Sequence, residues 1–238
     1  DARKTDLMRI AAMIVTSFVL TSGPGNATPP NVIIKAEYGE PTDRYDHGIL
    51  GDAIEWGALV LTVDQCFRCE ASMIRKFTIR LPESRVFEDF VPRLVDVDGD
   101  ETPEAIVVET DVNRGARLAI YGESGLIAAT PFIGRTHRWL APIGAADLDG
   151  DGFVELAYVD RPHLAKTIRV WRFKDGALEL AGELPGYTNH RIGEDNIAGG
   201  IRDCGNGPEM IVADANWRDV TAISFQGVTF AAKKLHPH

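Results

Sequence analysis

The sequence lacks clusters of basic residues. It has 25 lysines and arginines against 35 aspartates and glutamates, which gives a formal net charge of −10 over 238 residues. Proteins that bind nucleic acid recruit the phosphate backbone through gathered Lys and Arg side chains. We therefore expect no nucleic-acid partner, and the surplus of carboxylates favours cations instead.

Helical periodicity and cysteine are also scarce. After residue 28, no window of roughly 12 to 18 residues keeps a clean helical period, and glycines and turn dipeptides recur throughout. The chain has three cysteines and a single C-x-x-C, so the paired motifs of a zinc site are missing. Since 45% of the residues are hydrophobic, a core can still form, and the sequence predicts an all-β fold.

The amino-terminal segment has the pattern of an export signal. Residues 8–27 begin with Met8 and the basic Arg9, continue with an apolar run over residues 10–20, and end with Gly25 and Ala27 at the −3 and −1 positions. The run is too short to span a bilayer, and a short buried helix is the alternative. Since the pattern begins at Met8, the seven residues before it are an upstream extension or a misassigned start.

Export sets the expected boundaries and redox state. We predict a signal peptide over residues 1–27, a single domain over residues 28–238, a periplasmic or secreted location, and no membrane span after signal removal. In an oxidising compartment, Cys66 and Cys69 of "CFRC" are candidates for a local disulfide. Pairing of Cys204 with either of them is the alternative.

Two acidic loops repeat in register. "DVDGDETPE" begins at Asp96, and "DLDGDGFVE" begins at Asp147, 51 residues later. Each loop leads directly into an apolar, β-rich run. A weaker copy, "IRDCGNGPE", ends at Glu209, and the weakest copy ends at Glu55. A glutamate before a strand is common to all four copies, so the chain contains four units of about 50 residues.

Hairpin signals complete each unit. Turn residues at 123–125, 175–176 and 226–227 follow three of the glutamate strands. Units of about 50 residues with about four short strands each have the dimensions of propeller blades. We predict a small β-propeller of four blades, in which the first strand, expected over residues 31–38, completes the last blade and closes the ring.

The acidic loops have the spacing of metal ligands. In D-x-D-G-D-x-x-x-E, the odd positions project inward when the loop winds around an ion, and the glycine permits the sharp turn. Calcium accepts about six to eight hard oxygens, whereas zinc prefers His or Cys, which both loops lack. Two in-register copies argue against simple solvated turns. The sequence predicts two calcium sites, formed by Asp96, Asp98, Asp100, Glu104 and the Thr102 carbonyl, and by Asp147, Asp149, Asp151, Glu155 and the Phe153 carbonyl.

These loops resemble the FG-GAP or VCBS repeats of integrin α-subunit propellers and of many bacterial exported proteins. In that family, the first, third, fifth and ninth loop residues and the seventh carbonyl bind calcium, which implies the same ligand sets here. The resemblance covers two units well, the third loosely, and the first only at its glutamate and strand. In the third loop, Ile201 and Gly205 replace two aspartates and leave Asp203 and Glu209, so we expect no calcium there.

A second pattern pairs histidines with aspartates. "HGILGDAI" and "HRIGEDNI" share H-x-I-x-x-D-x-I, which places His47 with Asp52 and His190 with Asp195 at equal spacing, and His137 holds a related place between them. One interpretation is a polar pocket at one mouth of the ring. The other is a set of repeated residues that stabilise turns. No G-x-S-x-G nucleophile motif accompanies the pattern.

Two functions follow from these patterns. The first is an exported, calcium-binding, FG-GAP-like propeller that serves as a non-enzymatic binding or scaffolding module for a protein or glycan. The alternative is a propeller hydrolase that uses His47, Asp52, His190 and Asp195. The enzyme requires both His–Asp pairs in one pocket within hydrogen-bonding reach, so their placement discriminates between the hypotheses.

Overall fold

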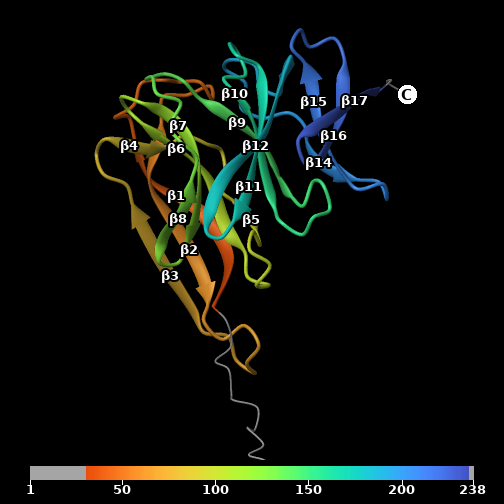
Figure 1. The fold of residues 1–238 in the computed structure, drawn as a ribbon. Coiled ribbons are helices and arrows are strands. Elements are labelled where there is room, and N and C mark those ends of the chain that lie inside the picture. The colour runs from red at the N-terminus through yellow and green to blue at the C-terminus, as the bar shows by residue number, and fades with distance from the viewer. Residues whose placement is uncertain (1–30, 236–238) are drawn as a thin grey trace, which may run out of the picture.

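The computed structural model describes residues 31–235, which contain 17 β-strands and no helix (Figure 1). Every strand pair is antiparallel, and the strands form three sheets. The all-β prediction is confirmed. The predicted signal peptide over residues 1–27 lies outside the described residues. Within residues 31–235, no helix is long and apolar enough to cross a membrane.

The first sheet has eight strands, drawn from orange to green in Figure 1. Its order is β1-β2-β4-β6-β7-β8, with β3 beside β2 and β5 beside β6. The strands are β1 (Val32–Thr42), β2 (Glu55–Asp64), β3 (Ile74–Arg80), β4 (Arg85–Phe87), β5 (Arg93–Val95), β6 (Glu104–Asp111), β7 (Gly115–Gly122) and β8 (Gly125–Ala129).

The second and third sheets follow along the chain and reach the blue carboxy-terminal end in Figure 1. The second sheet has the order β12-β11-β10-β9, with strands β9 (Leu140–Ala146), β10 (Glu155–Asp160), β11 (Thr167–Lys174) and β12 (Ala177–Pro185). The third has the order β13-β15-β16-β17, with β14 beside β15, and its strands are β13 (Tyr187–Thr188), β14 (Gly200–Asp203), β15 (Pro208–Asp214), β16 (Val220–Gln226) and β17 (Thr229–Leu235).

Three of the four predicted units share one strand plan. The strand that carries the repeated glutamate lies between an approach strand and a hairpin strand, as β6, β10 and β15 do, and an outer strand completes the unit. The hairpin between β11 and β12 turns at Asp175 and Gly176, whose φ angles of 50° and 75° are the left-handed values that a two-residue hairpin turn requires. Three stretches of the chain therefore share this strand order.

The first unit departs from the prediction. It has three strands, β1, β2 and β3, and the pairing of Trp56 with Phe87 in β4 joins it to the second unit in one sheet. The prediction that the first strand completes the last blade is wrong, because β1 pairs along its length with β2. Ile33 of β1 packs against Leu59, Leu61 and other residues of one apolar cluster. The strand that follows β1 in the sequence therefore buries its apolar side chains. No closed ring of paired strands forms within residues 31–235.

Apolar clusters join the sheets. One cluster lies within the first sheet and includes Leu61 and Phe87. A second brings Ile106 and Ile120 of the first sheet against Trp139, Leu156 and their neighbours around the second. A third brings β10 and β11 of the second sheet against β15 and β16. Successive sheets thus bury their faces against each other, and the loops at the strand ends are held in fixed relative positions.

Candidate metal centres

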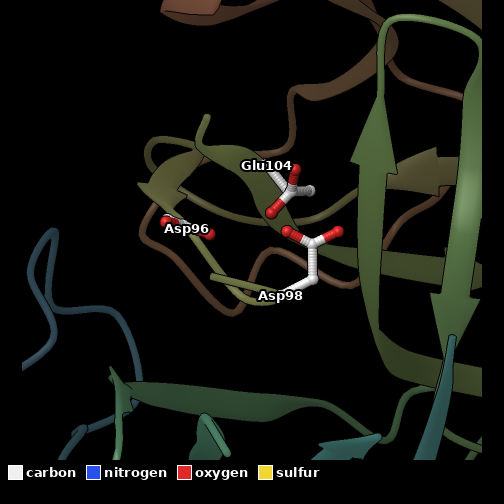
Figure 2. Close-up of side chains that lie close together, drawn as sticks. All are labelled: Asp96, Asp98 and Glu104. Atoms are coloured by element: carbon white, nitrogen blue, oxygen red, sulfur yellow. The ribbon is translucent and has the colours of Figure 1, made fainter. Parts of the chain in front are cut away.

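The first acidic loop connects β5 to β6 and gathers three carboxylates. Ligand oxygens of Asp96, Asp98 and Glu104 all lie within 4.8 Å of one another. Figure 2 shows the three side chains around a common space, with Glu104 at the start of β6 facing Asp98. Glu104 is buried and Asp98 is exposed, so the site opens to solvent on one side.

The loop is shaped by its own acids. Asp96 accepts hydrogen bonds from the backbone N–H groups of Gly99 (2.7 Å) and Glu101 (2.9 Å), which draws the chain into a tight curve. Glu104 Oε2 accepts from the N–H of Val97 at 3.0 Å and ties the start of the loop to its end. Asp100 accepts from the N–H of Thr102 at 2.7 Å and stands outside the group of three close carboxylates.

The second acidic loop, between β9 and β10, repeats this geometry. Oxygens of Asp147, Asp149 and Glu155 lie within 4.8 Å of one another. Asp147 accepts from the N–H groups of Gly150 (2.7 Å) and Gly152 (3.0 Å), and Glu155 Oε2 accepts from that of Leu148 at 2.8 Å. Asp151 accepts from the N–H of Phe153 at 3.0 Å. The two loops are thus structural copies, residue for residue.

A single arginine distinguishes the two loops. Arg172 lies on β11 directly opposite Glu155, and its Nε donates to Glu155 Oε1 at 2.7 Å. Its Nη2 lies 3.0 Å from an oxygen of Asp151 and also contacts Asp149. At the first loop, the neighbouring strand β7 ends in Gly122, which has no side chain to offer. The Arg172 guanidinium of β11 therefore places a positive charge among the carboxylates of the second loop.

The pKa values of the two buried glutamates follow this difference. Burial raises the pKa of Glu104 to about 7, and repulsion from Asp98, Asp100 and Asp96 adds to the rise. Burial also raises the pKa of Glu155, but the hydrogen bond from Arg172 acts in the opposite direction. Among the described residues, no cationic side chain pairs with the three gathered carboxylates of the first loop, and Arg68 reaches only the exposed Glu101 beside them. In the second loop, the Arg172 guanidinium compensates much of the negative charge.

The two degenerate loops hold their acids differently. In the third repeat, Asp203 accepts from the N–H of Gly205 at 2.7 Å, and Glu209 pairs with Arg202 at 3.2 Å. In the first repeat, Glu55 is buried, and His47 precedes it by the same eight positions by which Asp96 precedes Glu104. Neither loop gathers three carboxylates, so among the described residues only the two full copies do so.

The His–Asp pairs that the hydrolase alternative requires do not form. His47 Nδ1 lies 2.5 Å from Glu88 Oε1, while Asp52 accepts from the N–H of Ile54 at 2.9 Å. His190 contacts the Glu194 carbonyl at 3.0 Å through Nε2, and Asp195 is exposed. Each aspartate lies only five residues after its histidine, and the intervening backbone turns the two side chains to different partners.

The histidines nonetheless meet in one place. The histidine cluster consists of His47, His137, His163 and His190, which are all the histidines of the described residues. The rings of His47 and His137 are 5.2 Å apart between centroids, as are those of His163 and His190. Trp139 links the two pairs, since its ring stacks edge-on with His190 at 5.0 Å and its Nε1 donates to the Glu88 carbonyl at 2.8 Å.

Sequence reasoning found part of this cluster. The shared spacing around His47 and His190 indicated that their loops are related, and the N–H of Gly193 donates to the Ile49 carbonyl at 3.2 Å between them. Glu88 and His163 carried no such signal, because they come from loops outside the repeated motif.

Burial raises the pKa of Glu55 to about 9, with repulsion from Glu88, Asp52 and Asp89 adding to it.

The CFRC motif lies at the end of the β2–β3 hairpin. A disulfide joins Cys66 to Cys69, with 5.2 Å between their Cα atoms. Cys204 is exposed and is the free cysteine of the described chain. The disulfide closes a short loop. Cys204 lies in the degenerate acidic loop of the third repeat.

The buried histidines of the cluster oppose folding at acid pH. Burial lowers the pKa of His163 to about 4 and lowers that of His190. In the unfolded chain histidines take up protons near pH 6.5, so these two groups remove stability as the pH falls from 6.5 to 4, whereas the raised pKa values of Glu55 and Glu104 add stability over the same window. The contribution of His163 is therefore measured as the difference between the wild type and a His163 variant in denaturant titrations across this window, and we expect it to be on the order of 2 kcal/mol.

His163→Gln keeps a donor towards His190 and removes one titration, so this variant should lose less stability on acidification than the wild type. His137→Gln, whose side chain is partly exposed at the edge of the cluster, is the matched control, so that the comparison of the two variants isolates the buried ring of His163. If the free energy of unfolding of His163→Gln changed with pH as that of the wild type does, the assignment of the acid response to the His163 ring would be wrong.

Comparisons with known proteins returned no match: neither a scan against protein-family models, nor a search of curated proteins, nor a search of solved structures found one.

Proposed function

We propose that this chain is an exported, calcium-binding β-propeller module of the FG-GAP or VCBS type, which binds a protein or glycan and has no enzymatic role. The observation that carries the proposal is the pair of acidic loops with the same hydrogen bonds at the same positions. A solvated turn has no reason to recur with this detail 51 residues later, whereas a ligand loop does.

The donor set favours calcium over other ions. Each loop offers only oxygen ligands, with carboxylates from Asp96, Asp98 and Glu104 in the first. Hard, loosely arranged oxygens suit Ca²⁺, while Mg²⁺ demands a stricter octahedron and Zn²⁺ prefers nitrogen or sulfur. Burial raises the pKa of Glu104, and repulsion from the neighbouring aspartates, which a bound cation would remove, adds to the rise. Asp100, Asp151 and the carbonyls of Thr102 and Phe153 would complete the ligand sets.

A four-bladed ring is the finer form of the fold that we propose. Four glutamate strands recur at about 50-residue intervals, and three belong to complete four-stranded units. Support for closure comes from the loops before β2 and β14, where the Gly193 N–H reaches the Ile49 carbonyl. First and last units therefore touch through loops, although β17 and β1 do not pair.

The absence of the two His–Asp hydrogen bonds favours a binding role over a hydrolase. The hydrolase alternative needs His47 with Asp52 and His190 with Asp195, and neither pair forms. A hollow of about 350 Å³ lies instead between the two acidic loops, lined in part by Asp98, Ile127, Phe153 and Lys174. Exposed aromatic and apolar side chains beside carboxylates suit a glycan or protein surface. The export pattern of residues 8–27 and the Cys66–Cys69 disulfide support a periplasmic or secreted location.

Calcium should raise the melting temperature. A ligand that binds only the folded state stabilises it by mass action, and calcium at about 100 times its Kd gives about 2.7 kcal/mol per site, or several degrees for a chain of this size. Scanning calorimetry with calcium and with chelator measures this shift. The double variant Asp98→Asn and Asp149→Asn should lose the response, while Asp203→Asn in the degenerate loop should keep it. A melting temperature indifferent to calcium in the wild type would overturn the proposal.

Arg172 should weaken the second calcium site. Its guanidinium occupies the carboxylates that the ion needs, so Arg172→Met is expected to raise calcium affinity at that loop by about tenfold, the equivalent of one charge-assisted contact. Calorimetric titration separates the two sites when each is tested in the background of Asp98→Asn. Arg169→Met, on the same strand and paired with Asp160 and Glu183, is the control. Equal affinities in both variants would show that Arg172 does not compete.

The hollow between the loops should retain the partner. Immobilised protein is exposed to extracellular extract fractions enriched in glycoproteins and polysaccharides, with calcium or with chelator. Retention is expected to need calcium and to be lost in Phe153→Ser with Lys174→Ser, because these side chains line the hollow and pack against each other. Val228→Ser, in an exposed turn of the third sheet, should bind like the wild type. Retention in the Phe153 and Lys174 variant would place the partner elsewhere.

A further inference from the structure

The β2–β3 hairpin ends in a projecting loop that has no role in the metal centres. We define the hairpin tip as residues 65–76, which comprise the loop after β2 and the first three residues of β3. Figure 1 shows this end of the hairpin extending away from the second and third sheets. Ten of its twelve residues are exposed, from Phe67 to Lys76.

The hairpin tip is rigidly built despite this exposure. Asp64 is buried and its Oδ1 accepts hydrogen bonds from the N–H groups of Cys66 (3.0 Å) and Met73 (2.9 Å). The Gln65 N–H donates to the Met73 carbonyl at 2.8 Å, and the Cys66–Cys69 disulfide closes the turn between them. A loop with this much internal bonding presents its side chains in a fixed arrangement, which lowers the entropic cost of binding.

Three large apolar side chains are exposed at the hairpin tip. Phe67, Met73 and Ile74 are each more than half exposed, at 55%, 53% and 51%. Scattered apolar residues are normal on a protein surface, but three at the end of one braced loop form a patch of the kind that marks an interaction site. Nothing in the rest of the described chain covers them.

The charge of the tip opposes that of the whole chain. Residues 65–76 contain Arg68, Arg75 and Lys76 against the single acid Glu70, which gives a net charge of +2, whereas the chain as a whole carries −10. All three basic residues are exposed. Apolar side chains ringed by Lys and Arg match the boundary of an anionic bilayer, where acyl chains lie beneath a layer of phosphates.

The position of the tip also points to a membrane. β1 begins at Val32, which pairs with Asp64 at the base of the tip. Val32 lies five positions after Ala27, the predicted end of the export segment, and an extended chain covers at most about 3.6 Å per position. While that segment is in the bilayer, the base of the tip lies within about 20 Å of it. This step rests on the proposed export and on no property of the calcium sites.

We propose that the hairpin tip docks on an anionic lipid surface. Phe67, Met73 and Ile74 enter the headgroup boundary, and Arg68, Arg75 and Lys76 contact lipid phosphates. Arg68 also pairs with Glu101 of the first acidic loop, but both partners are largely exposed, so this ion pair is weak and exchanges readily for phosphate. The interaction gives the module a fixed orientation at the membrane, with the third sheet held away from it.

A tryptophan placed in the tip tests this directly. In the full chain, Phe67→Trp is compared with Val228→Trp, whose position in the third sheet is 77% exposed. Vesicles contain equal parts of phosphatidylcholine and phosphatidylglycerol with brominated acyl chains that quench nearby indoles. Emission of Phe67→Trp should shift to shorter wavelength and be quenched, and that of Val228→Trp should not. A probe at position 67 reports on the tip itself, whereas co-sedimentation of the full chain with vesicles would also count any binding through residues 10–20.

Charge removal separates lipid binding from other causes. Changing Arg68, Arg75 and Lys76 to Gln in the Phe67→Trp background should weaken quenching by about fivefold in lipid affinity per charge, and vesicles without phosphatidylglycerol should do the same. Equal quenching at positions 67 and 228 would overturn the proposal. A spectral shift that grows with protein concentration in the absence of vesicles would also overturn it, since a second copy would then cover the tip. The calcium response of the melting temperature is unaffected by either outcome.

Discussion

A buried glutamate at the start of a central strand organises each acidic loop. Glu104 and Glu155 accept a hydrogen bond from the backbone seven residues earlier, at Val97 and Leu148, and this contact closes the loop on itself. Closure brings the aspartates together, and the same residue begins the strand that enters the apolar core. The energetic conflict is plain, because a buried carboxylate among other carboxylates is costly unless a cation joins it. The proposed metal binding and strand formation are thus linked through one side chain.

The sequence was informative about features that follow from local, repeated patterns. It was uninformative about contacts between strands or side chains that are not neighbours in the sequence. The acidic loops, the hairpin at Asp175 and Gly176 and the all-β class follow from local patterns, since turn chemistry and strand alternation act over a few residues. The pairing of β1 with β2 was missed because an apolar strand carries no label for its neighbour. Arg172 was also missed: only the register of β10 against β11 shows that it faces Glu155.

The histidine cluster illustrates the same limit in a different way. Equal spacing around His47 and His190 marked two loops that contact each other in the fold, but it left open whether each histidine uses the nearby aspartate. In the structure, His47 reaches Glu88, and His190 reaches His163 and a backbone carbonyl. Thr110 donates to the second oxygen of Glu88 at 2.5 Å. These groups satisfy one another, which is the arrangement of a structural polar network.

The contact between the loops of the first and last units changes how the chain behaves as a repeat protein. In an open array, each unit touches only its neighbours, so the ends fray and stability is a sum of local terms. Here the Gly193–Ile49 hydrogen bond joins loops of the first and last units, which are far apart in sequence. A contact of this kind couples the two terminal units, which favours cooperative unfolding over fraying of the ends. It is also a non-local contact that can form only after the last unit has been synthesised, and non-local contacts slow folding.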